Sequence, residues 1–167
     1  MKGFKNAEVY VEGKGIVKTS VAFCGEKIAE IGGNSSFEEI ALPENAVVLP
    51  GFIDEHIHGA AGSDAMDGSV NALETIANSV AGEGTTAFLA TTMTQSPENI
   101  SNALAAVKEY RESNCENGAE VLGVHLEGPF INVAKAGAQP HEYITTPSVE
   151  KFDEYNKISG NCIKIVT

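Results

Sequence analysis

The chain has 167 residues, of which 43% are hydrophobic and 20% are charged. This composition is typical of a globular protein with one sizeable core, and it excludes wholesale disorder of the chain. Its 23 acidic and 11 basic residues give a formal net charge of -12, which argues against nucleic acid or an anionic membrane as the main partner. No segment approaches the roughly 20 apolar residues that span a bilayer, and the widely spaced Cys24, Cys115 and Cys162 indicate reduced thiols, so we expect a cytoplasmic protein.

The first part of the chain alternates short apolar and polar runs with glycines. In residues 7–31 this pattern predicts small antiparallel strands, and we expect residues 1–47 to form the amino-terminal part of a small β-sandwich. A polar interval follows in residues 32–45. Residues 46–58 then have the composition of one apolar strand that runs into a pair of histidines.

Beyond Gly59, helices and strands alternate. Apolar residues at helical spacing, with Ser or Pro at the start, predict helices over residues 69–81, from Ser96 to about Tyr110, and from Pro147 or Ser148 onward. The third helix is expected to turn Val149, Phe152 and Ile158 inward. Apolar and β-branched runs predict strands over residues 85–92, 121–126 and 162–166.

This alternation predicts an α/β fold with parallel strands joined by right-handed crossovers, as in a doubly wound sheet or a (β/α)8 TIM-type barrel. Four strands are expected from Val47 onward. Because a complete barrel takes about 250 residues, residues 48–167 would form the first half of one. The chain also ends on an apolar strand, so we expect a truncated, partial barrel.

His56 and His58 carry the strongest chemical signal. A β-strand sends alternate side chains to one face, so this pair presents two imidazole rings side by side, with Ile53 and Ile57 on the other face. Neutral imidazole is a common ligand for zinc and its first-row neighbours. Alone, the pair is equally compatible with two strand histidines hydrogen-bonded to backbone or water, and a catalytic metal needs at least one further ligand.

Glu127 is the candidate third ligand. It follows the strand of residues 121–126, and in parallel α/β folds the carboxyl ends of strands carry the active site. Alternation places His125 and Glu127 on one face and Val124 and Leu126 on the other, so Glu127 is expected to meet the two histidines. By itself such a glutamate is more often a solvated strand end. His125 is expected to be structural, as a hydrogen-bond donor behind the ligands.

Further motifs extend this pattern along the chain. In order, they are Pro50-Gly51-Phe52-Ile53-Asp54, His56-Ile57-His58-Gly59, Gly84-Thr85-Thr86, Phe88-Leu89-Ala90-Thr91-Thr92, His125-Leu126-Glu127-Gly128-Pro129-Phe130, Ala136-Gly137-Ala138-Gln139-Pro140 and Ile163-Lys164-Ile165-Val166-Thr167. A single HxH motif is a weak signal, but the ordered set resembles the N-acetylglucosamine-6-phosphate deacetylases of the amidohydrolase superfamily.

The resemblance implies a (β/α)8 barrel with a small β-sandwich made from both ends of the chain, of which the amino-terminal part is present here. It implies that His56 and His58 bind one divalent metal and that Glu127 is a ligand able to bridge to a second ion. Because both histidines are present, two ions are expected in the complete enzyme. Ligand type does not decide between zinc and iron.

The resemblance also implies where substrate binds. The contacts to the sugar map onto Ala138 and Gln139, although many relatives carry His where this chain has Gln139. The Asp that moves the proton, two further His ligands and an Arg that holds the phosphate are expected beyond Thr167. No proton-transferring catalytic residue is therefore expected within this chain.

The activity implied is metal-assisted hydrolysis that removes the acetyl group of N-acetylglucosamine 6-phosphate, giving glucosamine 6-phosphate and acetate. The complete enzyme would be a cytoplasmic homodimer acting on this small molecule. One alternative is another amidohydrolase that acts on a cyclic or linear amide, against which the motifs around Glu127 and Gln139 argue. The other is that this chain is an inactive half-barrel, which would associate through its unpaired strand edges.

Overall fold

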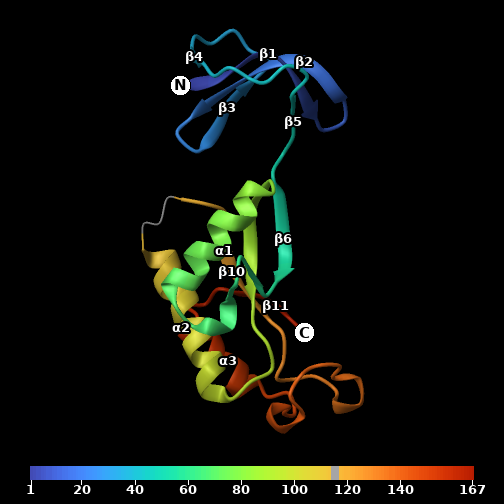
Figure 1. Cartoon of the computed structure of the whole chain (residues 1–167), viewed down its shortest axis with the longest axis vertical. Helices are drawn as coiled ribbons and strands as arrows, with labels where there is room; N and C mark the ends of the chain where they lie inside the picture. Colours follow the sequence, from blue (N-terminus) through green and yellow to red (C-terminus); the bar gives the residue numbers. More distant parts are fainter. Residues whose placement is uncertain (114–116) are drawn as a thin grey trace. The chain divides into compact units, whose positions relative to one another are not determined.

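The computed structural model describes residues 1–113 and 117–167, in which two compact units are distinguished, Met1–Pro50 and Gly51–Thr167 (Figure 1). None of the described helices is long and apolar enough to cross a membrane. Cys24 is exposed and Cys162 is buried, and both are free thiols, whereas Cys115 lies outside the described residues. Each unit has its own hydrophobic cluster.

The first unit is a five-stranded mixed sheet with the order β3-β2-β1-β4, in which β5 also pairs with β1. Its strands are β1 (Lys2–Val11), β2 (Gly15–Cys24), β3 (Lys27–Ile31), β4 (Glu38–Glu39) and β5 (Val47–Val48). The antiparallel pairing of β1 with β2 and of β2 with β3 confirms the predicted antiparallel strands, while β4 and β5 run parallel to β1. Apolar side chains on one face bury Ala7, Val9 and Val21 together.

The prediction of one continuous strand over residues 46–58 is wrong. β5 ends at Val48, and β6 begins only at Phe52. Pro50, between them, has no backbone N–H to donate to a neighbouring strand and restricts the residue before it. β5 pairs with β1 of the first unit, whereas β6 pairs with β9 of the second. The break therefore lies where the chain passes from one unit to the other.

The second unit contains a four-stranded parallel sheet with the order β11-β10-β9-β6. Its strands are β6 (Phe52–Ile57), β9 (Thr85–Thr91), β10 (Glu120–Leu126) and β11 (Ile163–Val166), and its helices are α1 (Val70–Gly82), α2 (Pro97–Glu112) and α3 (Val149–Ile158). Shorter elements are the hairpin of β7 (Gly59–Ala60) and β8 (Ser63–Asp64) and the 3-10 turns η1 (Ala65–Asp67), η2 (Val133–Lys135) and η3 (His141–Tyr143). This alternation of parallel strands and helices confirms the predicted α/β fold.

The three helices pack against one face of the parallel sheet (Figure 1). The cluster beneath them takes Phe88 and Ala90 from β9 and Val124 and Leu126 from β10, all at most 1% exposed. It also takes Leu73, Ile76 and Val80 from α1, Ile100, Leu104 and Val107 from α2, and Tyr155 from α3. Because strand side chains alternate, the residues between these apolar positions are directed to the opposite face.

Serine side chains set where the helices begin. Ser69, Ser96 and Ser148 each accept a hydrogen bond from the backbone N–H three residues later, at 3.2 Å in all three cases. Pro97 occupies the first turn of α2, where its missing N–H costs nothing. These contacts agree with the predicted starts of the three helices.

The third helix faces the core differently from the prediction. Val149 is 71% exposed, so its expected inward position is wrong, whereas Phe152 and Ile158 do pack against the cluster. The fully buried residue is Tyr155, one turn beyond Phe152, and Val149 lies in the first turn, at the end of the apolar stripe. Burial raises the pKa of the Tyr155 hydroxyl, and the ammonium of Lys151, 4.8 Å from the ring centroid, acts in the opposite direction.

Candidate metal centre

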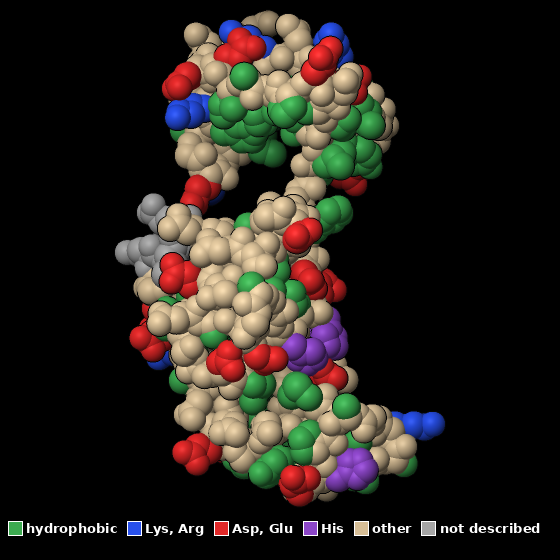
Figure 2. All heavy atoms as spheres, viewed as in Figure 1, with side chains coloured by type: hydrophobic (Ala, Val, Ile, Leu, Met, Phe, Trp, Pro, Cys, Tyr) green, Lys and Arg blue, Asp and Glu red, His purple; other side chains and the backbone are tan. Residues whose placement is uncertain are grey.

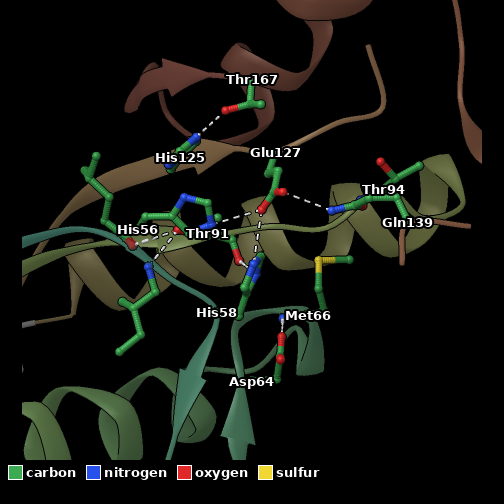
Figure 3. Close-up of polar contacts among 12 residues, drawn as sticks. His56, His58, Asp64, Met66, Thr91, Thr94, His125, Glu127, Gln139 and Thr167 are labelled. Atoms are coloured by element: carbon green, nitrogen blue, oxygen red, sulfur yellow. Dashed lines mark hydrogen bonds and ion pairs between the residues drawn. The ribbon is translucent and has the colours of Figure 1, made fainter. Parts of the chain in front are cut away.

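Three side chains from distant parts of the sequence converge at one edge of the parallel sheet (Figure 3). The Nε2 atoms of His56 and His58 each lie 3.1 Å from the same carboxylate oxygen, Oε2 of Glu127. One ligand atom from each residue lies within 4.8 Å of the others. Within the described residues, 1–113 and 117–167, His56, His58 and Glu127 form the one cluster of three or more His, Cys, Asp or Glu side chains that could hold a metal ion.

The parallel pairing of the strands explains the convergence. His58 follows β6, which ends at Ile57, and Glu127 follows β10, which ends at Leu126. Since the strands are parallel, both positions lie at the same, carboxyl edge of the sheet, where α/β proteins build their sites. Figure 2 shows histidine side chains gathered on the surface of the second unit beside acidic ones.

The pairing of β6 with β9 shifts register next to the histidines. Asp54 pairs with Phe88 and Ile57 pairs with Ala90, so β6 has one extra residue relative to β9 over this stretch. The Asp54 carboxylate accepts a hydrogen bond from the backbone N–H of His56 at 3.0 Å. Simple alternation therefore does not hold along β6. Ile57 packs on the core, but Ile53, expected on the same face, is 62% exposed.

Thr91, at the end of β9, orients the second histidine. Its backbone carbonyl lies 3.2 Å from Nδ1 of His58, and its hydroxyl accepts a hydrogen bond from the N–H of Ile57 at 3.0 Å. A proton on Nδ1 that is donated to a carbonyl leaves the lone pair of Nε2 free to bind a cation. Thr91 is fully buried, so this support is fixed by the core of the unit.

His125, on β10, contacts two other segments of the second unit beside the proposed ligands. Its Nδ1 lies 3.0 Å from the carbonyl of Glu55 on β6, and its Nε2 lies 2.7 Å from the hydroxyl of Thr167, beyond β11. Its ring centroid lies 4.7 Å from that of His56 in an edge-to-face arrangement. His125 is only 5% exposed and both of its ring nitrogens contact other groups, which agrees with the structural position expected for it.

Replacing His125 with alanine is expected to lower the free energy of unfolding by about 2–4 kcal/mol, because the change leaves a cavity and removes the partner of the Glu55 carbonyl and of the Thr167 hydroxyl. Urea denaturation of the chain measures the effect. His141→Ala is the matched control, because His141 is exposed at the start of η3 and should tolerate the change. Equal denaturation midpoints for the two variants would refute this structural role.

The two carboxylate oxygens of Glu127 have different surroundings. Its Oε1 accepts a hydrogen bond from Nε2 of Gln139 at 3.1 Å. Its Oε2 is buried and receives no well-directed hydrogen bond from the described residues, although both histidine nitrogens lie close to it. A buried carboxylate oxygen without a donor is costly unless a cation or proton compensates it.

The residues at this edge fit a metal ion. Two donors bound at about 2.0–2.1 Å in tetrahedral geometry lie about 3.3 Å apart, close to the 3.1 Å between each histidine nitrogen and the Glu127 oxygen. Two neutral imidazoles and one carboxylate are a donor set that suits zinc or iron. The side chains of His56 and His58 are 51% and 34% exposed, so the two rings that cover Oε2 of Glu127 are open to solvent.

The structure thus brings together all three residues predicted as metal ligands, and metal binding itself stays a prediction. Of the two predicted sugar contacts, Gln139 is half-buried against Glu127, whereas Ala138 is exposed in the same loop. The supporting role of Thr91 could not be found from the sequence. A threonine that ends a buried strand was the only signal, and such threonines are equally common in strands without a site.

Comparisons with known proteins agree with this geometry. A family model described as "Amidohydrolase family" matches residues 47–163. The chain is 48% identical over 132 residues to an N-acetylglucosamine-6-phosphate deacetylase of Bacillus subtilis (strain 168), a match that covers 78% of this chain and 33% of the relative. It is 41% identical over 150 residues to a protein of the same name from Lysinibacillus sphaericus, with 84% of this chain and 37% of the relative covered.

Solved structures include a crystal structure of N-acetylglucosamine-6-phosphate deacetylase from Thermotoga maritima, which superposes with a TM-score of 0.76 at 29% sequence identity. That superposition covers 91% of this chain and 39% of the other. The chain therefore spans about a third of the length of the curated relatives that it matches.

Proposed function

Because this chain belongs to the amidohydrolase family, we propose that it supplies the first metal ligands of an enzyme that removes the acetyl group of N-acetylglucosamine 6-phosphate. The convergence of His56, His58 and Glu127 on one point at the carboxyl edge of the parallel sheet carries this proposal. The substrate is inferred from the names of the Bacillus and Lysinibacillus relatives. The products would be glucosamine 6-phosphate and acetate.

We propose that residues 48–167 are the first half of a (β/α)8 barrel and that residues 1–47 contribute to a small β-sandwich. The sheet order supports this arrangement, because β6 and β11 are outer strands and a closed barrel would pair both of them. Phe52 and Ile53 on β6 and Val166 on β11 are exposed apolar side chains, at 65%, 62% and 48%, which further strands would cover.

In this proposal the ligands of the chain hold a zinc or iron ion, and two ions are present in the complete enzyme. A divalent cation at such a site supplies hydroxide at neutral pH and polarises the acetyl carbonyl. His58 contributes Nε2 because Thr91 engages its Nδ1, and His56 contributes Nε2 while its ring rests against His125. Glu127 contributes Oε2 and the negative charge that makes the set selective for a cation.

We further propose that the complete enzyme acts in the cytoplasm as a homodimer on this small phosphorylated sugar. The free thiols of Cys24 and Cys162 support a reducing compartment. The acidic balance of the chain, with a net charge of -12, supports a small-molecule substrate rather than nucleic acid.

A chimera tests the proposed activity. Residues 1–167 replace the matching segment of the Bacillus subtilis deacetylase, and acetate release from N-acetylglucosamine 6-phosphate is measured beside the parent enzyme. We expect turnover that is lost after dialysis against a chelator and restored by zinc or ferrous iron, because three of the proposed metal ligands come from this chain.

The outcome that contradicts the proposal is acetate release that survives complete removal of metal. Unphosphorylated N-acetylglucosamine and a cyclic amide serve as comparison substrates. A folded chimera that binds metal and hydrolyses the cyclic amide, but not the phosphorylated sugar, would assign the chain to another amidohydrolase reaction.

A further inference from the structure

Gln139 lies in the loop between β10 and α3, and both ends of its side chain are hydrogen-bonded. Its Oε1 accepts from the backbone N–H of Thr94 at 2.7 Å, and its Nε2 donates to Oε1 of Glu127 at 3.1 Å (Figure 3). The orientation of the amide is fixed by its partners, since an N–H must face an oxygen and a carboxylate must face the NH2 group. One side chain therefore connects two points of its own loop, Gln139 and Glu127, to the loop that follows β9, at the carboxyl edge of the sheet.

Thr94, whose backbone N–H donates to the Gln139 amide, lies in tightly packed surroundings. Thr94 is fully buried, in the loop between β9 and α2. Gly128, directly after Glu127, packs so closely that a Cβ placed there would lie 1.9 Å from the hydroxyl oxygen of Thr94. Gln139 thus connects Glu127 to the backbone of a fully buried residue that packs closely against Gly128.

Because of the contact with Gln139, the two carboxylate oxygens of Glu127 have different partners. The amide occupies Oε1, and Oε2 faces the two histidine nitrogens. A hydrogen bond to the oxygen that is not facing the ion fixes the rotation of the carboxylate and lowers the ordering cost of binding. The sugar contact that the family resemblance assigns to Gln139 would leave this geometry unexplained.

From these contacts we propose that Gln139 is a positioning residue that holds Glu127 ready for a cation by connecting it to the backbone of Thr94. This role rests on the proposed function, because it presumes the metal site. It requires both the acceptor and the donor of the amide, and it acts before any sugar is bound.

Two variants separate the two ends of the amide. Gln139→Ala removes both hydrogen bonds, while Gln139→Glu keeps an acceptor for Thr94 N–H and replaces the donor to Glu127 by a second negative charge. Gln95→Ala is the matched control, because Gln95 lies in the neighbouring loop and its Oε1 accepts only from Ser96 and Asn99 among the described contacts.

The readout is the dissociation constant of zinc for the chain without any substrate, measured by competition with a chromogenic chelator, with circular dichroism to check the fold. We expect Gln139→Ala to weaken zinc binding about 10–100-fold. Gln139→Glu should also alter binding of the ion, although it preserves the contact to Thr94, whereas Gln95→Ala should leave the constant unchanged.

Unchanged zinc affinity in folded Gln139→Ala, with a raised KM for the sugar in the chimera, would overturn the positioning role and leave a sugar contact in its place. His56→Ala is measured in parallel to distinguish this failure from a failure of the proposed function. If the unaltered chain and His56→Ala bind zinc equally weakly, the metal site itself is wrong, and the role of Gln139 is overturned with it.

Discussion

Replacing Glu127 with glutamine is expected to lower acetate release by the chimera by about 10³-fold, equivalent to about 4 kcal/mol of transition-state stabilisation. The substitution keeps the size of the side chain and removes its charge. Both histidine nitrogens face Oε2 of Glu127, so the change removes the one anionic ligand that they share. The zinc affinity of the chain should fall together with the activity.

Glu120→Gln is the matched control for this substitution. Glu120 begins β10, the strand that Glu127 follows, and its side chain is exposed at the opposite end of the strand. It loses the same charge without touching the site, so its activity should equal that of the unaltered chimera. Retention of most of the turnover by Glu127→Gln would remove this carboxylate from the mechanism.

Replacing Leu126 with alanine is expected to destabilise the chain by about 2–5 kcal/mol, the range for removing a buried leucine side chain from a well-packed core. Leu126 is fully buried among the helices, and it immediately precedes the proposed ligand Glu127. We therefore expect the variant to unfold at lower urea concentration and, where it remains folded, to bind zinc more weakly.

Leu122→Ala in the same strand is the control for this second prediction. Leu122 is only half-buried, so its removal leaves a smaller cavity and should cost clearly less stability. Denaturation midpoints of the two variants are compared at equal slopes of the unfolding transition, since a changed slope would indicate a different degree of unfolding. A Leu126→Ala variant as stable as Leu122→Ala would mean that β10 is not anchored by its helix-facing side chains.

Local sequence patterns were sufficient for the elements of the second unit. The helices begin where serine caps precede apolar residues at helical spacing, because both signals depend on residues within one or two turns. Strand alternation also separated His125 from Val124 and Leu126 correctly, although the pairing of β10 with β11 shifts register between Val124 and His125.

The features that the sequence could not predict depend on contacts between distant segments. The extra residue of β6 near His56 appears only when the strand pairs with β9. The contact of Gln139 with Thr94 joins residues 45 positions apart, and no local pattern signals it. Val149 was misplaced because the end of an apolar stripe looks the same whether or not a neighbouring element covers it.

The most direct test of the shared cation is a crystal structure of this chain grown with zinc, with diffraction recorded on both sides of the zinc absorption edge. We expect an anomalous peak bonded at about 2.0–2.2 Å by Nε2 of His56, Nε2 of His58 and Oε2 of Glu127. An ordered zinc ion bound elsewhere, with these three groups bonded to no common ion, would contradict it.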